Sequence, residues 1–130
     1  MIAVIIGFNF AIILYVLVCH WIADFLFQNQ WMYEEKRRDP NALMMHVCTY
    51  TLIVTTMLFW LIPSFTALTV FVLVVLVGHY VIDSISVIIV HKLEILGRFH
   101  TIYAIIGLDQ ILCLSLLFYT LVTLINTFPR

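Results

Sequence analysis

The chain has 130 residues, of which 65% are hydrophobic and only 10% are charged, and its formal net charge is −1. A mean hydropathy of +1.15 excludes an ordinary soluble domain and indicates an integral membrane protein. The near-neutral charge offers no basic surface, so we expect no nucleic-acid partner. Because a spanning helix needs roughly 20 apolar residues, we predict an all-α polytopic protein whose single transmembrane domain, residues 1–130, is a bundle of four transmembrane helices.

The apolar runs, and the residues that separate them, place four helices along the chain. No basic residue precedes the first run and no small-residue cleavage site follows it, which predicts a spanning helix and not a signal peptide. Asp39 and Pro40 are typical of a helix start, Pro63 and Ser64 of a break, and Gly97 of a helix end. The predicted helices run over about 2–29, 40–62, 65–94 and 101–127.

Two short loops, 30–39 and 92–100, hold nearly all of the basic residues. Of the 6 Lys and Arg residues in the chain, only Arg130 lies outside these loops. Short cytoplasmic loops are enriched in Lys and Arg, so we expect both loops in the cytoplasm and both termini outside.

The apolar runs are interrupted by ionisable residues at helical spacing. His20, Asp24 and Gln28 follow one another at four-residue steps and therefore share one face of the first helix. His79 and Asp83 repeat the step in the third helix. Ionisable groups in apolar surroundings are unfavourable unless they meet partners, water or a metal, which makes them candidates for function.

Six such groups, from all four helices, fall at a similar depth. With a rise of about 1.5 Å per residue, each lies roughly 8 to 20 Å from the predicted cytoplasmic end of its helix. This convergence indicates one buried site, and histidine and aspartate together suit zinc, manganese or iron. The predicted metal ligands are His20, Asp24, His46, His79, Asp83 and Asp109.

The same residues leave other roles open. His46 and Asp109 could serve as catalytic acid or base groups instead of ligands. Gln28 and Gln110 are expected to hydrogen-bond around the ligands or between helices, and the histidines and aspartates could also do no more than tie helices together. Gly78 and Gly107 lie next to this layer and are expected to let helices approach closely.

The order and spacing of these residues resemble a bacterial and phage membrane family known as domain of unknown function 3307. The resemblance covers nearly the whole chain and implies a small multi-pass protein of the bacterial inner (plasma) membrane, with no established activity. Two positions depart from the family pattern: Cys113 stands where a histidine tends to follow Asp-Gln, and Ser86 where a lysine often follows the second aspartate. Cys113 either exchanges one soft ligand for another or removes a ligand, so we place it around the site. The matching elements are His20-x3-Asp24-Phe25-x2-Gln28, the loop with Lys36, His46, His79-x3-Asp83 and Asp109-Gln110.

Three functions are compatible with this pattern. The first is a metal-dependent hydrolase that acts on a lipid or lipid-linked substrate, because the site lies below the headgroups; the layout also loosely resembles small membrane-bound metal-dependent hydrolases. The second is an ion or proton transporter, which would need a polar path to the outer face. The third is a non-catalytic adaptor that binds a host membrane complex. Expected partners are membrane lipids and either further copies of the chain or another membrane protein.

Overall fold

The chain is all-α, as predicted, and its helices follow the predicted boundaries closely after residue 40. A computed structural model describes the backbone of residues 2–128 and the side chains of residues 10–128. The elements are α1 (Ile2–Trp21), the π-helical turn η1 (Ile22–Leu26), α2 (Gln30–Glu35), α3 (Pro40–Leu58), the 3-10 turn η2 (Phe59–Leu61), α4 (Phe65–Ile95) and α5 (Phe99–Thr127).

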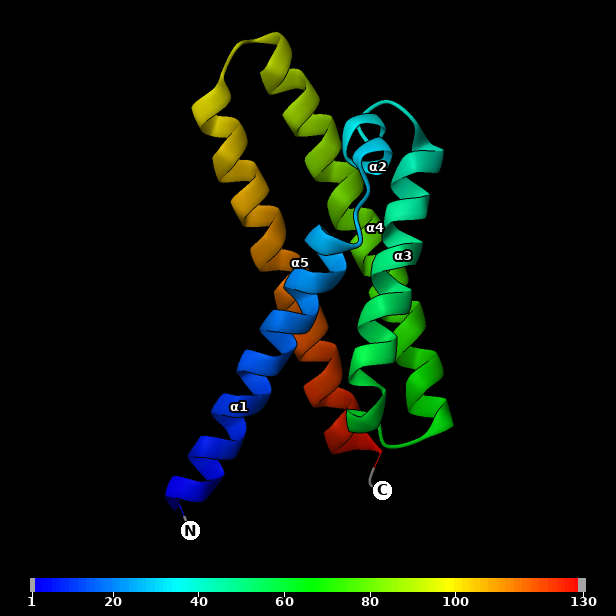
Figure 1. The fold of residues 1–130 in the computed structure, drawn as a ribbon, viewed down its shortest axis with the longest axis vertical. Helices are drawn as coiled ribbons and strands as arrows, with labels where there is room; N and C mark the ends of the chain where they lie inside the picture. The colour runs from blue at the N-terminus through cyan, green and yellow to red at the C-terminus, as the bar shows by residue number, and fades with distance from the viewer. Residues whose placement is uncertain (1, 129–130) are drawn as a thin grey trace.

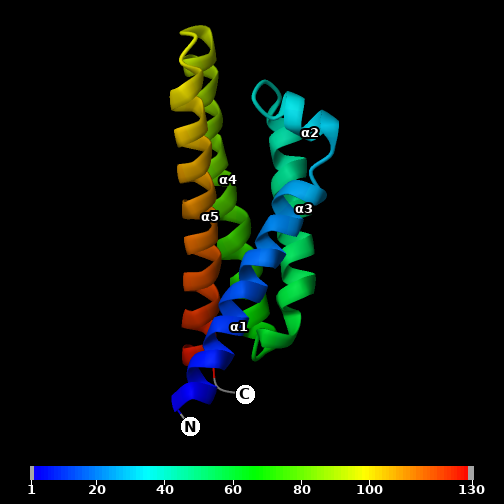
Figure 2. The ribbon, with the colours of Figure 1, turned by 60° about the vertical axis from the view of Figure 1, so that its left-hand side comes forward.

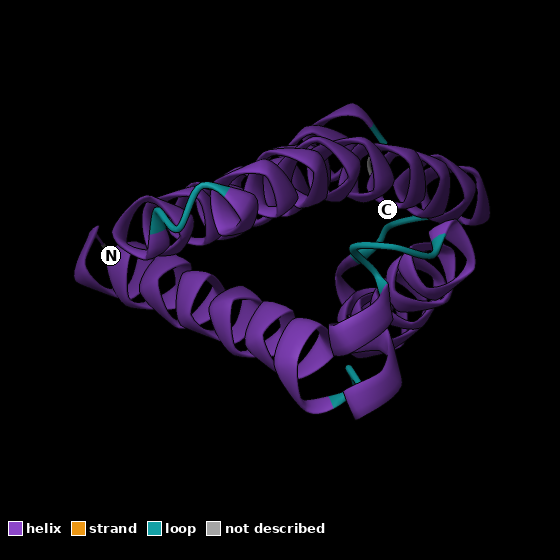
Figure 3. Ribbon diagram, turned by 90° about the horizontal axis from the view of Figure 1, so that it is seen from above, coloured by secondary structure: helices purple, strands orange, loops and turns teal. Residues whose placement is uncertain are grey.

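The helix axes are inclined to one another, and α4 and α5 are antiparallel neighbours (Figure 1). Helix α3 packs against α4, and α1 crosses α5 and then diverges from it toward its own beginning. Figure 2 shows α4 and α5 side by side and α1 crossing beside them. The end-on view in Figure 3 shows that the helix axes are inclined to one another. Helix α2 and the turn between α4 and α5 lie at one end of the molecule, opposite the start of α1 and the end of α5 (Figure 1).

Within the described part of the chain, three helical segments are long and apolar enough to cross a membrane. They cover Pro40–Leu61, Phe65–Ile95 and Phe99–Thr127, and a shorter apolar segment covers Phe10–Leu26. At about 1.5 Å per residue, α4 is roughly 46 Å long and exceeds a hydrocarbon core of about 30 Å. These lengths and compositions characterise a multi-pass membrane protein.

Local side-chain hydrogen bonds explain where the helices begin and end. The Asp39 carboxylate accepts from the amide of Asn41 at 2.9 Å, and Pro40 occupies the first helical position. Ser64 caps α4 in the same way. Gly97 has φ 65°, the left-handed conformation that glycine adopts at a helix end without steric strain. The predicted starts at residues 40 and 65, and the end near residue 97, are thereby confirmed.

The first predicted helix, by contrast, does not run straight to residue 29. The backbone widens into the π-helical turn η1, which contains Asp24, and α2 then begins within the predicted loop 30–39. Asn29 starts α2 by accepting from the amide of Met32 at 2.8 Å. Single π turns inside helices frequently occur at functional sites, because they shift the direction in which side chains point.

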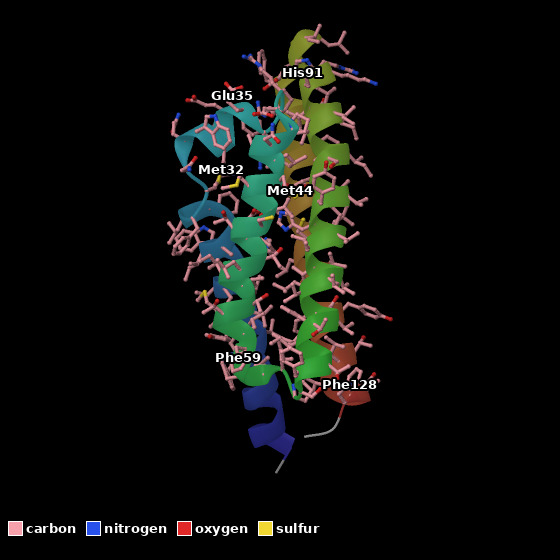
Figure 4. All side chains as sticks on the ribbon, turned by 90° about the vertical axis from the view of Figure 1, so that its right-hand side faces the viewer. Met32, Glu35, Met44, Phe59, His91 and Phe128 are labelled. Atoms are coloured by element: carbon pink, nitrogen blue, oxygen red, sulfur yellow. The ribbon has the colours of Figure 1, made fainter. Side chains whose placement is uncertain are left out.

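An apolar core fills the half of the molecule away from α2. Tyr50 in α3, Phe71 in α4 and Leu117 in α5 are fully buried there. Figure 4 shows the two ends of this arrangement: Phe59 and Phe128 lie at the apolar end, and Met32, Glu35 and His91 lie at the other. The buried ionisable side chains lie next to this core. They are His20, Asp24, His46, His79, Asp83 and Asp109.

Candidate metal centre

His46 on α3 is the centre of the buried ionisable cluster. Its Nε2 atom lies 3.1 Å from Oδ1 of Asp24 and 3.3 Å from Oδ2 of Asp83. The two carboxylates come from η1 and α4, so His46 joins elements that are distant in the sequence. The side chain of His46 is only 1% exposed.

His79 completes a group of four side chains. Its Nε2 atom lies 3.3 Å from Oδ1 of Asp83, one helical turn further along α4, and 3.8 Å from Oδ1 of Asp24. The four-residue step predicted to place His79 and Asp83 on one face therefore does so. Asp24, His46 and His79 each offer a ligand atom, and these atoms lie within 4.8 Å of one another.

The geometry of this group fits a small metal ion. A tetrahedral ion with ligand bonds of about 2.0 Å separates its ligand atoms by roughly 3.3 Å. The N···O separations between the two histidines and Asp24 are 3.1 and 3.8 Å, and these three residues form one group of possible ligands. Asp83 lies 3.3 Å from each histidine, through Oδ2 at His46 and Oδ1 at His79. Two imidazoles and two carboxylates are also a ligand set that zinc, manganese and iron accept.

The buried polar atoms around this point lack hydrogen bonds. Nε2 of His46, Nε2 of His79 and Oδ2 of Asp83 are fully buried, and none of them forms a hydrogen bond although carboxylates and imidazoles lie nearby. A buried polar atom without a partner is destabilising by about 1–3 kcal/mol. Each of the three atoms nevertheless lies within 3.3 Å of an atom of opposite character in the cluster, so a shared proton or a common cation would satisfy them.

A second, overlapping group includes a thiol. His79, Asp83 and Cys113 also offer ligand atoms within 4.8 Å of one another. Sγ of Cys113, on α5, lies 4.0 Å from Oδ1 of Asp83. Cys113 was predicted to lie around the site, and it is close enough to serve as an alternative ligand on the α5 side.

Gln110 on α5 links the cluster to its surroundings. Its amide nitrogen donates to Oδ2 of Asp24 at 2.7 Å and to Oδ2 of Asp109 at 3.3 Å. Its amide oxygen lies 3.1 Å from Nε2 of His20, whose Nδ1 lies 2.8 Å from the hydroxyl of Tyr50. Gln110 thus fixes one oxygen of Asp24 and leaves the other directed toward the two histidines.

Gln28 contacts the other side of His46. The amide of Gln28 lies 3.1 Å from Nδ1 of His46. In this orientation the amide nitrogen donates to Nδ1. A half-turn of the amide would present its oxygen to an Nδ1–H group and leave the Nε2 lone pair for a metal, which is how a hydrogen-bonded partner sets the tautomer of a ligating histidine.

A cavity of about 90 Å³ borders the cluster. Asp24, Asp83, Asp109 and Gln110 line its polar wall, and Lys36 from the end of α2 also borders it. The carboxylates of Asp24 and Asp83 therefore border a space that a small molecule can enter. The cavity and the cluster together place titratable groups at a confined space, which is typical of a ligand-binding site.

Comparison with known proteins identifies the family. The family described as protein of unknown function (DUF3307) matches residues 12–129. The chain belongs to the DUF3307 family. No curated protein and no solved structure matches the chain.

The structure brings together four of the six ligands predicted for this DUF3307 chain. Asp24, His46, His79 and Asp83 form the cluster. His20 lies beside it with both ring nitrogens engaged by Tyr50 and Gln110. Asp109 lies on the cavity wall, where its Oδ1 accepts from Ser86 at 2.6 Å and its Oδ2 from Gln110.

Three residues at the DUF3307 site were not predicted to take part: Lys36, Tyr50 and Ser86, whose hydroxyl donates to Asp109. Nζ of Lys36 lies 3.8 Å from Oδ2 of Asp83, although Lys36 belongs to the charged segment after the first span. Tyr50 lies between His20 and His79, with its ring centroid 4.0 Å from that of His79. The sequence of the charged segment contains the basic side chains but gives no indication that Lys36 turns inward. Tyr50 is one helical turn after His46, which is a signal that could have identified it.

Proposed function

We propose that this DUF3307 chain is a metal-dependent hydrolase of membrane lipids or lipid-linked substrates. Asp24, His46, His79 and Asp83 are its metal ligands, and the proposal rests above all on the buried atoms of His46, His79 and Asp83 that lack hydrogen bonds. Zinc, manganese and iron fit this ligand set.

Charge also supports a divalent cation. Asp24, Asp83 and Asp109 contribute three negative charges when ionised, and Lys36 and Arg37 contribute two positive charges at the rim, so the lining of the cavity has a net charge of −1 with neutral histidines. Buried charges need compensation within hydrogen-bonding or coordination distance. One divalent ion supplies two positive charges at the point where the carboxylates converge.

The proposed position in the membrane rests on the distribution of basic residues over the helix ends. In the proposed topology, Phe10–Leu26 joins the three long segments as a fourth span, and the ends with α2 and the α4–α5 turn face the cytoplasm. The basic residues Lys36, Arg37 and Lys92 lie at this end of the protein, which in the proposed topology is at the cytoplasmic face of the bacterial inner membrane. The cluster then lies in the cytoplasmic half of the bilayer, within reach of ester and phosphoester bonds near the headgroups.

The catalytic roles follow from the positions of the side chains. A divalent ion held by the four ligands would make a coordinated water easier to deprotonate. Asp109 lies on the same cavity wall without belonging to the ligand group, and it is proposed to accept the proton from the attacking water. Ser86 and Gln110 each donate to one of its oxygens and hold the carboxylate in place.

The apolar core argues against transport as the main function. A transporter needs polar groups that continue from the site to the outer face. Below the cluster, the described core consists of residues such as Val54, Phe71 and Leu121, all buried. The buried Thr51 and Thr120 hydroxyls donate to carbonyls of their own helices, so they offer no relay through this core.

An assay on purified protein tests the hydrolase proposal. The protein is incubated in detergent with bacterial phospholipids and with zinc, manganese or iron, and the released products are identified by mass spectrometry. We expect metal-dependent release that a chelator stops and that Asp83→Asn abolishes. Asp39→Asn is the matched control, because Asp39 only caps α3. A metal-loaded protein that releases no product from any lipid would contradict the proposal.

A further inference from the structure

The cavity beside the cluster has a cationic rim in addition to its acidic wall. Lys36 and Arg37, at the end of α2, both line it. The ammonium of Lys36 lies 3.8 Å from Oδ2 of Asp83, which is beyond hydrogen-bond distance, so its three N–H donors are not spent on this carboxylate. Arg37 is more strongly engaged, because it pairs with Glu94 on α4 and lies over the ring of Tyr33. Lys36 is therefore the cation best placed to bind a ligand.

Part of the cavity lining is apolar and borders the outside of the helices. Phe25, Val87 and Ile106 line it. Phe25 is 49% exposed and Ile106 is 37% exposed, so both side chains contact the cavity and also face the surroundings of the bundle. In a bilayer these surroundings are acyl chains. A lipid tail can therefore lie against Phe25 and Ile106 while its polar end occupies the cavity.

Aromatic residues place the cationic rim at the depth of the headgroups. Trp31 and Tyr33 are both about half exposed and belong to the same short helix, α2, that ends at Lys36. Exposed Trp and Tyr side chains concentrate at the membrane–water interface. Lys36 therefore lies at the headgroup side of the proposed metal ligands. This is the depth at which the phosphate of a phospholipid lies.

We propose that this cavity binds the phosphate group of a membrane lipid, with Lys36 as its cationic partner and with Phe25 and Ile106 against the acyl chain. The proposal deepens the hydrolase function and rests on it for the reaction. Asp24, Asp83 and Asp109 line the same cavity and oppose the binding of an anion, and Lys36, together with the proposed cation, offsets their charge. An ammonium with available donors is a general partner for phosphate. The volume of about 90 Å³ suits one small polar group and a few waters and excludes a large headgroup.

Calorimetric titration with short-chain lipids tests this inference on full-length protein in detergent. The probes are dihexanoyl phosphatidic acid, dihexanoylglycerol, which lacks the phosphate, and inorganic phosphate, which lacks the chains. We expect the first probe to bind at least 10-fold more tightly than either of the others to the unaltered protein. Equal binding of dihexanoylglycerol would overturn the role of phosphate, and equal binding of inorganic phosphate would overturn the role of the apolar wall.

Substitution of Lys36 tests its assigned role. Lys36→Met should weaken binding of dihexanoyl phosphatidic acid by roughly 10- to 100-fold, since a charged hydrogen bond contributes about 1.5–3 kcal/mol. Lys36→Arg should retain most of it. Lys92→Met is the matched control, because Lys92 carries the same charge at the same end of the molecule and does not line this cavity. Unchanged binding by Lys36→Met would overturn the assignment.

Metal content measured on the same samples separates the two proposals. If metal is bound and Lys36→Met binds phosphatidic acid normally, the phosphate inference is wrong and the hydrolase proposal stands. If no metal is bound but phosphatidic acid binding depends on Lys36, the phosphate site is real and the hydrolase proposal is wrong.

Discussion

Asp24 and Asp83 share one nitrogen atom, because their carboxylate oxygens lie 3.1 and 3.3 Å from the same Nε2 of His46. The two aspartates belong to η1 and α4, and neither forms a conventional hydrogen bond with that nitrogen. A shared cation explains why the two negative charges are held so near each other. Their separate contributions should therefore not be independent.

Loss of either aspartate should remove most of the bound metal. Asp24→Ala and Asp83→Ala each delete one of the four proposed ligands, and the double variant should lose little more than either single one, because residues that act as a unit are not additive. Metal content after dialysis against a weak chelator measures this. If both changes instead lower thermal stability additively and leave metal content intact, the two side chains only tie helices together.

Loss of His20 should leave the metal in place. Both ring nitrogens of His20 bond to Tyr50 and Gln110, so His20→Gln removes a supporting contact and not a ligand. We expect stoichiometric metal with a lower melting temperature. Loss of metal equal to that in Asp83→Ala would show that His20 is itself a ligand, as the sequence suggested.

Gln110→Leu should weaken metal binding without abolishing it. Gln110 donates to Asp24 at 2.7 Å, and removing such a partner typically lowers metal affinity by roughly 10- to 100-fold. Competition with a fluorescent chelator gives the affinity. Gln30→Leu is the control, because Gln30 is exposed and its side chain bonds to Glu34. An unchanged affinity for Gln110→Leu would remove Gln110 from the site.

The two glycines near the site should respond differently to alanine. A Cβ atom at Gly78 would lie 2.3 Å from Cδ2 of Leu116, whereas one at Gly107 would meet nothing within 4 Å. Gly78→Ala should therefore destabilise the protein by about 1–3 kcal/mol, and Gly107→Ala by none or stabilise it by up to about 1 kcal/mol. Thermal unfolding in detergent compares them. Equal effects would show that α4 and α5 do not approach as closely at Gly78 as described.

The orientation of the chain is testable by cysteine labelling. In a background without Cys19, Cys48 and Cys113, we expect Glu34→Cys to be shielded from impermeant thiol reagents in intact cells and Thr127→Cys to react. The expectation follows from the concentration of Lys and Arg at the α2 end. Reaction at residue 34 but not at residue 127 would reverse the orientation.

Helical spacing predicted much of this fold and site because it constrains local geometry. The four-residue step placed His79 beside Asp83, and the residue pair Asp39-Pro40 marked the start of α3. The spacing of residues does not predict the π turn that contains Asp24. The formation of that turn depends on how η1 packs against α3. The close approach predicted at Gly78 is confirmed, and the one predicted at Gly107 is wrong, because helix rotation about its axis is set by tertiary contacts.

The same limit applies to the residues around the His46 cluster. His20 has the ligand type and the depth of a metal ligand, yet its hydrogen bonds with Tyr50 and Gln110 engage both of its nitrogens. Lys36 was hidden among neighbouring charges, and only the fold of α2 directs it toward Asp83. Which of several nearby polar groups form a hydrogen bond depends on differences of an ångström or two in the distances between their atoms. Sequence patterns do not contain these distances.

Elemental analysis of the purified protein tests the account most directly. Protein extracted in mild detergent, without added metal or chelator, should contain about one equivalent of zinc, manganese or iron per chain. His46→Ala prepared in parallel should contain almost none, since Nε2 of His46 contacts both aspartates of the cluster. Folded protein that contains none of these metals, and that takes up none when they are supplied, would contradict the metal centre.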